Sequence, residues 1–258
     1  MEAALARVMS SHLNAIEIKR TPQGPQVHRR WAPPSLARSL GVDPSVEVAA
    51  QRLAAAQGLA PAVYDFDADR GGFSMAFVAG EPLEADWVQR PERVELLLET
   101  IKKLRCIDAA GLPGIDLPAR LLALHTRLAG LDALAARAWA APLRQFMRRW
   151  HRGAAGSASV LAGRVLVHGD LGPGNLIVQA DGRPCLLDFE YAHRGHPDED
   201  LAGLAAQPGV EASLAARLHA ASVDPGAFAD RVELRRLLDG VWVALAARLQ
   251  SRARVASV

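Results

Sequence analysis

The sequence has few of the features that mark secreted, membrane or nucleic-acid-binding proteins. Its 258 residues include only two cysteines, Cys106 and Cys185, too few for a disulfide framework or a four-ligand zinc site. No run reaches 18 uninterrupted apolar residues, and the N-terminus has no signal-peptide core. The formal net charge of +2 is too small for the electrostatic footprint of a nucleic-acid-binding protein. These absences predict a reduced, cytoplasmic protein that binds neither nucleic acid nor membrane.

The composition is that of a folded protein, with 50% hydrophobic and 22% charged residues. The length suffices for one large domain or two modest lobes. The pattern changes near Gly80, because short β-like runs precede it and helical patterns follow it. We therefore expect an α+β fold with a β-rich N-lobe over residues 1–80 and a mainly helical C-lobe over residues 81–258.

The first part of the chain contains signals for strands and one helix. Residues 15–19 and 26–31 are β-prone and flank the turn sequence of residues 21–24, which predicts a hairpin. Asp43 followed by Pro44 is typical of a helix N-terminus. We expect this helix to end at Gly58 and a further strand at residues 73–78.

Beyond Gly80 the apolar residues recur at helical spacing. Three stretches carry the pattern: residues 94–104, 118–150 and 234–249. Pro142 lies inside the second stretch and is expected to break or kink it. These apolar stripes indicate core packing and carry no functional prediction.

A β island at residues 165–187 interrupts the helices. Asp181-Gly182 predicts a two-residue type I′ hairpin turn, which pairs residues whose numbers sum to 363. Asn175 then lies opposite Asp188, and Asp170 follows the preceding apolar strand. We therefore expect the three side chains to converge at one edge of a small sheet.

This group of side chains indicates metal-assisted phosphoryl transfer. A carboxylate and an amide oxygen, here from Asp188 and Asn175, suit a hard cation such as Mg²⁺. A second carboxylate, that of Asp170, can orient or deprotonate an attacking hydroxyl group. Together these roles match the requirements of a kinase site.

The motifs HGDLxxxN and LLDFE in this stretch resemble those of the aminoglycoside phosphotransferase, choline kinase and thiamine kinase superfamily. The resemblance implies a bilobal protein-kinase-like fold and a requirement for ATP and Mg²⁺. It implies Asp170 as the catalytic residue and Asn175 and Asp188 as metal ligands. His168 and Asp200 are expected to support the catalytic loop rather than to react.

Weaker similarity extends into the N-lobe. Arg29 occupies the place of the basic residue that holds the nucleotide phosphates, although strand parity leaves Arg30 as an alternative. Glu47 stands where the family has the glutamate of an ion pair, and the backbone of Ala76 and Val78 would bind adenine.

The turn expected to cover the phosphates departs from the family pattern. Ser10 and Ser11 would contribute backbone amides there, but residues 10–14 contain no glycine, which makes close approach to phosphate harder. A nucleotide-binding pseudokinase without turnover is therefore kept as an alternative to an active kinase.

The predicted acceptor is a small hydroxylated cation of the choline or thiamine type, with an aminoglycoside as the alternative. Four acidic residues follow Asp188 closely and would attract a cation: Glu190, Asp198, Glu199 and Asp200. Tyr191 and Trp242 could add cation–π contacts. The expected assembly is a monomer or a homodimer.

Overall fold

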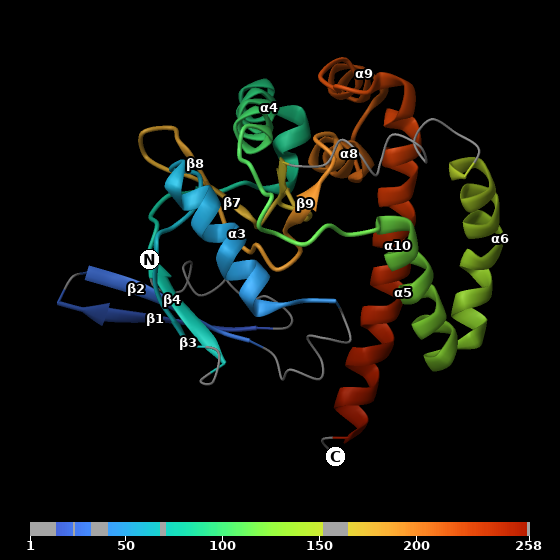
Figure 1. Ribbon diagram of the computed structural model, residues 1–258, viewed down its shortest axis with the longest axis horizontal. Coiled ribbons are helices and arrows are strands. Elements are labelled where there is room, and N and C mark those ends of the chain that lie inside the picture. Colours follow the sequence, from blue (N-terminus) through green and yellow to red (C-terminus); the bar gives the residue numbers. More distant parts are fainter. Residues whose placement is uncertain (1–13, 23, 32–40, 68–70, 152–164, 257–258) are drawn as a thin grey trace. The chain divides into compact units, whose positions relative to one another are not determined.

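The computed structural model describes residues 14–22, 24–31, 41–67, 71–151 and 165–256 of the chain. The described residues form three antiparallel sheets and a larger set of helices, so the predicted α+β class is confirmed. The chain divides into two compact units (Figure 1), residues 1–113 with 164–195 and residues 114–163 with 196–258. The predicted lobe boundary near Gly80 falls inside the first unit and stays a prediction.

The first unit begins with a four-stranded sheet in the order β1-β2-β4-β3. Its elements are β1 (Ala15–Thr21), β2 (Gly24–Arg30), α3 (Pro44–Ala56), β3 (Val63–Asp67) and β4 (Gly72–Ala76). The predicted hairpin and helix are confirmed, whereas β3 was not predicted. The Asp43 carboxylate accepts a hydrogen bond from the Ser45 amide, as expected of an N-cap.

The remainder of the first unit consists of short strands around one long helix. These elements are β5 (Glu81–Pro82), η1 (Ala85–Gln89), α4 (Pro91–Arg105), β6 (Val165–Val167), β7 (Leu176–Val178), β8 (Pro184–Leu186) and β9 (His193–Gly195). β5, β7 and β8 form one sheet, while β6 pairs with β9. The expectation of a single small sheet is therefore wrong, since the strand before Asp170 belongs to a separate pair.

The register of the β7–β8 hairpin also differs from the prediction. Leu176 pairs with Leu186 and Val178 with Pro184, so paired numbers sum to 362 rather than 363. The Gly182 amide donates to the Gln179 carbonyl, and Gly182 has φ +81°. The connection is thus a three-residue loop whose last residue is left-handed, the other common solution for this sequence. Consequently the backbone carbonyl of Asn175 accepts a hydrogen bond from the Leu187 amide, and Asn175 does not lie opposite Asp188.

The second unit is helical. Its elements are α5 (Leu117–Leu131), α6 (Ala133–Trp150), α8 (Glu199–Ala206), α9 (Ala212–Ala220) and α10 (Pro225–Ala256). Of the break or kink expected at Pro142, the break is wrong, because Pro142 lies inside α6 and the two helices are instead separated at Asp132, while the kink stays a prediction. The Asp132 carboxylate accepts from the Ala135 amide, which makes it the N-cap of α6.

The core of the second unit lies where α5 and α6 pack along α10 (Figure 1). Leu121, Phe146 and Val241 are fully buried there. Gly240 permits the close approach, because a Cβ atom at this position would lie 2.1 Å from the Trp139 ring. Among the described residues, no helix is both long enough and apolar enough to cross a membrane.

We expect Gly240→Ala to destabilise the protein by about 1–3 kcal/mol, since the new methyl group overpacks against the rigid Trp139 ring. The matched control is Gly203→Ala in α8, where the nearest side-chain atoms lie 4.0 Å away. That control should be neutral or stabilising by up to about 1 kcal/mol through helix propensity. Urea denaturation measures both changes, and equal effects of the two substitutions would contradict the packing argument.

Candidate active site

The site is organised around Arg29 on β2. Its side chain is 3% exposed and meets three carboxylates. Nη2 contacts Asp188 and lies 3.1 Å from Glu190 Oε2, while Nε lies 2.7 Å from Glu47 Oε1 in an ion pair that is not aligned as a hydrogen bond. Burial by itself lowers the pKa of the guanidinium, but the three carboxylates raise it above the usual value. The neighbouring Arg30 is exposed, so of the two arginines that the sequence offered for this position it is Arg29 that points into the cluster.

Helix α3 supplies Glu47 from its first turn. The Glu47 carboxylate is buried, and its Oε2 accepts a hydrogen bond of 2.8 Å from Trp31 Nε1. Burial raises the pKa of Glu47 to about 7, with a further rise from Asp188 opposed by Arg29 and Trp31. The pairing of a helix glutamate with a strand cation matches the sequence prediction in geometry.

Asp188 and Glu190 follow β8 and reach Arg29 together. Asp188 has φ +63° and is the non-glycine residue with a left-handed backbone in the part of the chain that the structure describes. Glu190 also accepts a 2.8 Å hydrogen bond from Asn14 Nδ2. Burial, followed by the Asp188 charge, raises the pKa of Glu190 to about 7. The prediction that Glu190 contacts the acceptor is untested, and the structure places it in the Arg29 cluster.

The loop after β6 brings Asp170 and Asn175 together. Asn175 Nδ2 donates to Asp170 Oδ2 at 2.8 Å and to the Asp170 carbonyl at 2.9 Å. Gly169, with φ +80°, begins this loop, and a Cβ atom there would lie 2.4 Å from the Tyr191 carbonyl oxygen. The glycine is therefore required by both backbone conformation and close approach. One carboxylate oxygen of Asp170 is oriented by the amide of Asn175.

His168 braces the same loop from the interior. Its side chain is buried, Nδ1 accepts from the Asp170 amide at 3.3 Å, and Nε2 lies 2.9 Å from the Leu187 carbonyl. Its ring also packs against Phe189 at a centroid distance of 4.7 Å. These contacts link the loop before Asn175 to the segment that carries Asp188, and the supporting role of His168 stays a prediction.

The donor set suits Mg²⁺ in its chemistry. Because Asn175 donates through Nδ2, its Oδ1 atom is the end of the amide that can act as a ligand. The Asp188 carboxylate is 19% exposed, and three carboxylates share a single guanidinium, which leaves an excess of negative charge. No group of three or more His, Cys, Asp and Glu side chains forms a ready metal cluster among the described residues.

The other predicted site residues are placed as follows. Ser10 and Ser11 lie outside the described residues. The Ala76 amide donates to the Ala62 carbonyl at 2.9 Å, and the predicted adenine contacts of the Ala76 and Val78 backbone stay predictions. Asp200, in the first turn of α8, and Trp242, packed on the core of the second unit, remain predictions in their supporting and acceptor roles.

Sequence reasoning missed Asn14 and Trp31, which hydrogen-bond Glu190 and Glu47 respectively. Both residues are at the ends of the β1–β2 hairpin, next to strand residues whose side chains alternate between faces. Trp31 is two residues beyond Arg29, so the period of two places both on one face of the strand. That spacing was an available signal for Trp31.

The family is shown by a model that matches residues 25–247, described as the phosphotransferase enzyme family, APH. The chain belongs to this phosphotransferase family. The match covers most of the chain and includes both motifs of the site, so the predicted family and the prediction of an enzyme, a small-molecule kinase, are confirmed. No curated protein matches the sequence significantly.

Solved structures of this fold include kinases for different small molecules. The choline kinase LicA from Streptococcus pneumoniae has TM-score 0.72 and 15% identity, covering 95% of this chain and 84% of that one. The ethanolamine kinase from Plasmodium vivax has TM-score 0.67 and 15% identity over 94% and 75%. The aminoglycoside phosphotransferase APH(4)-Ia, crystallised with AMP-PNP and hygromycin B, has TM-score 0.65 and 14% identity over 96% and 88%. At these identities the likeness shows the protein-kinase-like fold.

We predict that the wild-type protein loses stability as the pH rises from about 5 to about 7.5. The pKa values of Glu47 and Glu190 are raised to about 7 from an ordinary value of 4.5, so the folded state takes up protons that the unfolded chain does not. By linkage, this stabilisation is complete below pH 4.5 and is lost as the pH passes 7. Urea denaturation across this range measures the slope.

The variant Glu47→Gln keeps an acceptor for Trp31 and removes one of the two titrating groups. It should reduce the stability difference between pH 5 and pH 7.5 by up to about 3 kcal/mol, at 1.36 kcal/mol per pKa unit. The control Glu92→Gln, at an exposed site in the first turn of α4, should leave the slope unchanged. A wild-type slope in Glu47→Gln would contradict the assignment.

Proposed function

We propose that this phosphotransferase uses ATP and Mg²⁺ to phosphorylate a hydroxyl group of a small cationic molecule. The observation that carries the proposal is the Asp170–Asn175 contact, at 2.8 Å, which fixes one oxygen of a loop carboxylate beside the segment of Asp188. The neighbouring Arg29 cluster supplies both the cation for phosphate and an excess of carboxylates for a metal. Solved structures of the fold with AMP and with AMP-PNP support a nucleotide as the donor.

Asp170 would act on the acceptor hydroxyl. Its Oδ2 atom accepts a hydrogen bond from Asn175, which orients the carboxylate, and this carboxylate would orient the hydroxyl and take its proton. His168 and Gly169 hold the backbone of the loop, so the carboxylate needs little rearrangement before reaction. The presence of this ordered acid–amide pair favours turnover over a pseudokinase.

Asn175 Oδ1 and the Asp188 carboxylate would hold Mg²⁺, which when bound neutralises charge on the phosphates. Arg29 would then divide its donors between Glu47 and the nucleotide phosphates. The contact of Arg29 with Asp188 compensates the negative charge of the Asp188 carboxylate. Glu47 keeps the guanidinium in place throughout, because both groups are buried and paired.

The acceptor is proposed to be cationic, of the choline or thiamine type. The Arg29 cluster contains three carboxylates for one guanidinium, and Glu190 is among them, so the site attracts positive charge. An aminoglycoside, which carries several positive charges, is the alternative supported by the same argument and by the APH(4)-Ia fold.

We expect Asp170→Asn to lower kcat by about 10²–10⁴-fold with little effect on the free energy of unfolding, because the amide cannot accept the hydroxyl proton. ADP release with choline, ethanolamine, thiamine and kanamycin as acceptors measures activity. Asp65→Asn, an exposed acid on β3, serves as the control and should retain wild-type kcat. Wild-type turnover in Asp170→Asn would refute the assignment of the base.

We expect Asp188→Asn to raise the Mg²⁺ concentration needed for half-maximal activity by at least tenfold, since a neutral amide is a weaker ligand for a hard cation. Nucleotide binding in the presence of EDTA should change much less. Titration of MgCl₂ at fixed ATP measures the first effect, and fluorescence titration with a nucleotide analogue measures the second. An unchanged Mg²⁺ requirement would contradict the assignment of Asp188 as a metal ligand.

The acceptor class is tested separately from the chemistry. If neutral sugars or hydroxy acids are phosphorylated by the wild-type enzyme while choline, ethanolamine, thiamine and kanamycin are not, the electrostatic argument for a cation is wrong. The roles of Asp170 and Asp188 would stand in that case, because their variants are measured with whichever acceptor is active.

A further inference from the structure

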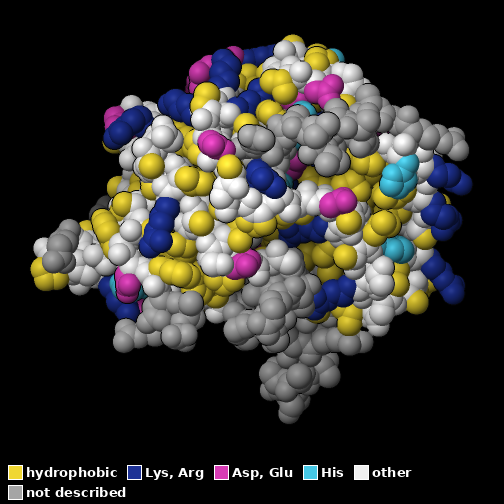
Figure 2. Space-filling view, in the orientation of Figure 1, with side chains coloured by type: hydrophobic (Ala, Val, Ile, Leu, Met, Phe, Trp, Pro, Cys, Tyr) yellow, Lys and Arg dark blue, Asp and Glu magenta, His cyan; other side chains and the backbone are white. Residues whose placement is uncertain are grey.

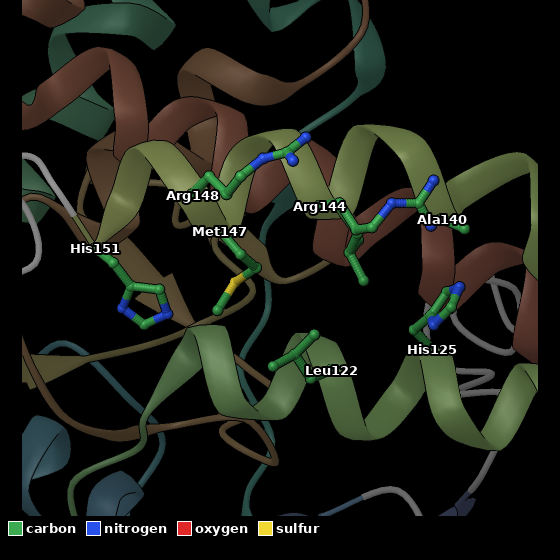
Figure 3. A pocket seen from close by; sticks show the side chains of 8 residues that line it. Leu122, His125, Ala140, Arg144, Met147, Arg148 and His151 are labelled. Atoms are coloured by element: carbon green, nitrogen blue, oxygen red, sulfur yellow. The ribbon is translucent and has the colours of Figure 1, made fainter.

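A groove of about 450 Å³ lies between α5 and α6 (Figure 3) and is not used by the proposed reaction. Its floor is apolar, with Leu122 from α5 and Leu143 and Met147 from α6. Its remaining lining comes from Ala140 and from four nitrogen-bearing side chains: His125, Arg144, Arg148 and His151. The lining contains no acidic side chain.

The segment of α5 and α6, which contains the groove, is positively charged, unlike the rest of the chain. The sequence from Leu117 to His151 contains six arginines and one acidic residue, Asp132, although the whole chain has a formal charge of only +2. The remainder of the chain is therefore net negative. Figure 2 shows His and Lys or Arg side chains beside hydrophobic surface over the region of α5 and α6.

The two arginines of the groove have no protein partner in the described part of the chain. Arg144 and Arg148 are exposed, lie one helical turn apart and form no hydrogen bond or ion pair with a described residue. Arg149, the adjacent residue, instead contacts Asp230 and Glu233. The cations at the groove thus remain available to an anion, while Arg149 serves the packing of α6 on α10.

We propose that this groove binds a single-chain anionic amphiphile, with its charged head at Arg144 and Arg148 and its apolar chain over Leu122, Leu143 and Met147. A guanidinium pair recognises a carboxylate or phosphate head, and apolar side chains take up the chain. The volume falls within the usual range for sites that enclose a small molecule. A concave floor suits one inserted chain better than the flat surface of a bilayer.

The proposal is independent of the phosphoryl-transfer site. All eight residues that line the groove belong to the second unit, whereas Arg29, Asp170, Asn175 and Asp188 belong to the first. Failure of one proposal therefore leaves the other intact. Binding is measured directly rather than through activity.

The experiment is isothermal titration calorimetry of the whole protein with three probes kept below their critical micelle concentrations. Dodecanoate has the head and the chain, butyrate has the head with little chain, and dodecyl maltoside has the chain with a neutral head. We expect dodecanoate to bind at one site, and the other two to bind at least tenfold more weakly.

Two pairs of matched variants locate the site. Arg144→Gln with Arg148→Gln should weaken dodecanoate binding at least tenfold. Arg137→Gln with Arg52→Gln removes the same charge from exposed positions outside the groove and should change binding less than twofold. Leu122→Glu, at a position 41% exposed, should abolish binding, whereas Leu134→Glu, at 77% exposed and outside the groove, should not.

Several results would overturn the proposal. If both double arginine variants lose dodecanoate affinity equally, the ligand is attracted by the net charge of the protein and does not bind at a defined site. If dodecyl maltoside binds as tightly as dodecanoate, an anionic head is not needed for binding and that part of the proposal is wrong. If dodecanoate does not bind at all, the groove is not a binding site for this class of ligand. Co-sedimentation with phosphatidylglycerol vesicles, if equally sensitive to both arginine pairs and unaccompanied by dodecanoate binding, would identify a membrane surface instead.

Discussion

The buried guanidinium of Arg29 is the interaction on which the site depends. It joins a strand, a helix and the segment after β8, because Glu47, Asp188 and Glu190 all converge on it. One positive charge faces three carboxylates, and burial together with the Asp188 charge raises the pKa values of Glu47 and Glu190. An added cation would offset the excess of negative charge in this cluster, which is consistent with the proposed use of Mg²⁺.

Close backbone approach provides the second constraint. Gly169 lies against the Tyr191 carbonyl, so the loop that carries Asp170 can sit beside the segment that follows Asp188. His168 then closes the arrangement through the Leu187 carbonyl. Main-chain contacts therefore help to hold Asp170, Asn175 and Asp188, the residues of the proposed reaction, in addition to their side-chain pairs. In the second unit, Gly240 plays the analogous packing role against Trp139.

Errors in the sequence-based prediction have local physical causes. Asp181-Gly182 fits both a two-residue and a three-residue hairpin loop, and the left-handed Gly182 of the longer loop shifts the register by one. Pro142 stays inside α6, while Asp132 breaks the helix because its carboxylate caps a new N-terminus. In both cases the local sequence permitted two solutions, and the prediction chose the one that the structure does not adopt.

The sequence by itself determined the family and the β-to-helix order of this protein, because both follow from residue types and spacing. The proposed roles of Asp170, Asn175 and Asp188 rest on the same sequence motifs. Only the tertiary structure decided that Glu190 and Trp31 join the Arg29 cluster, and that the cations of α6 border an apolar groove beside α5. Spacing along a chain fixes which face of an element a side chain occupies. Which elements bring those faces together depends on long-range packing, which no local pattern records.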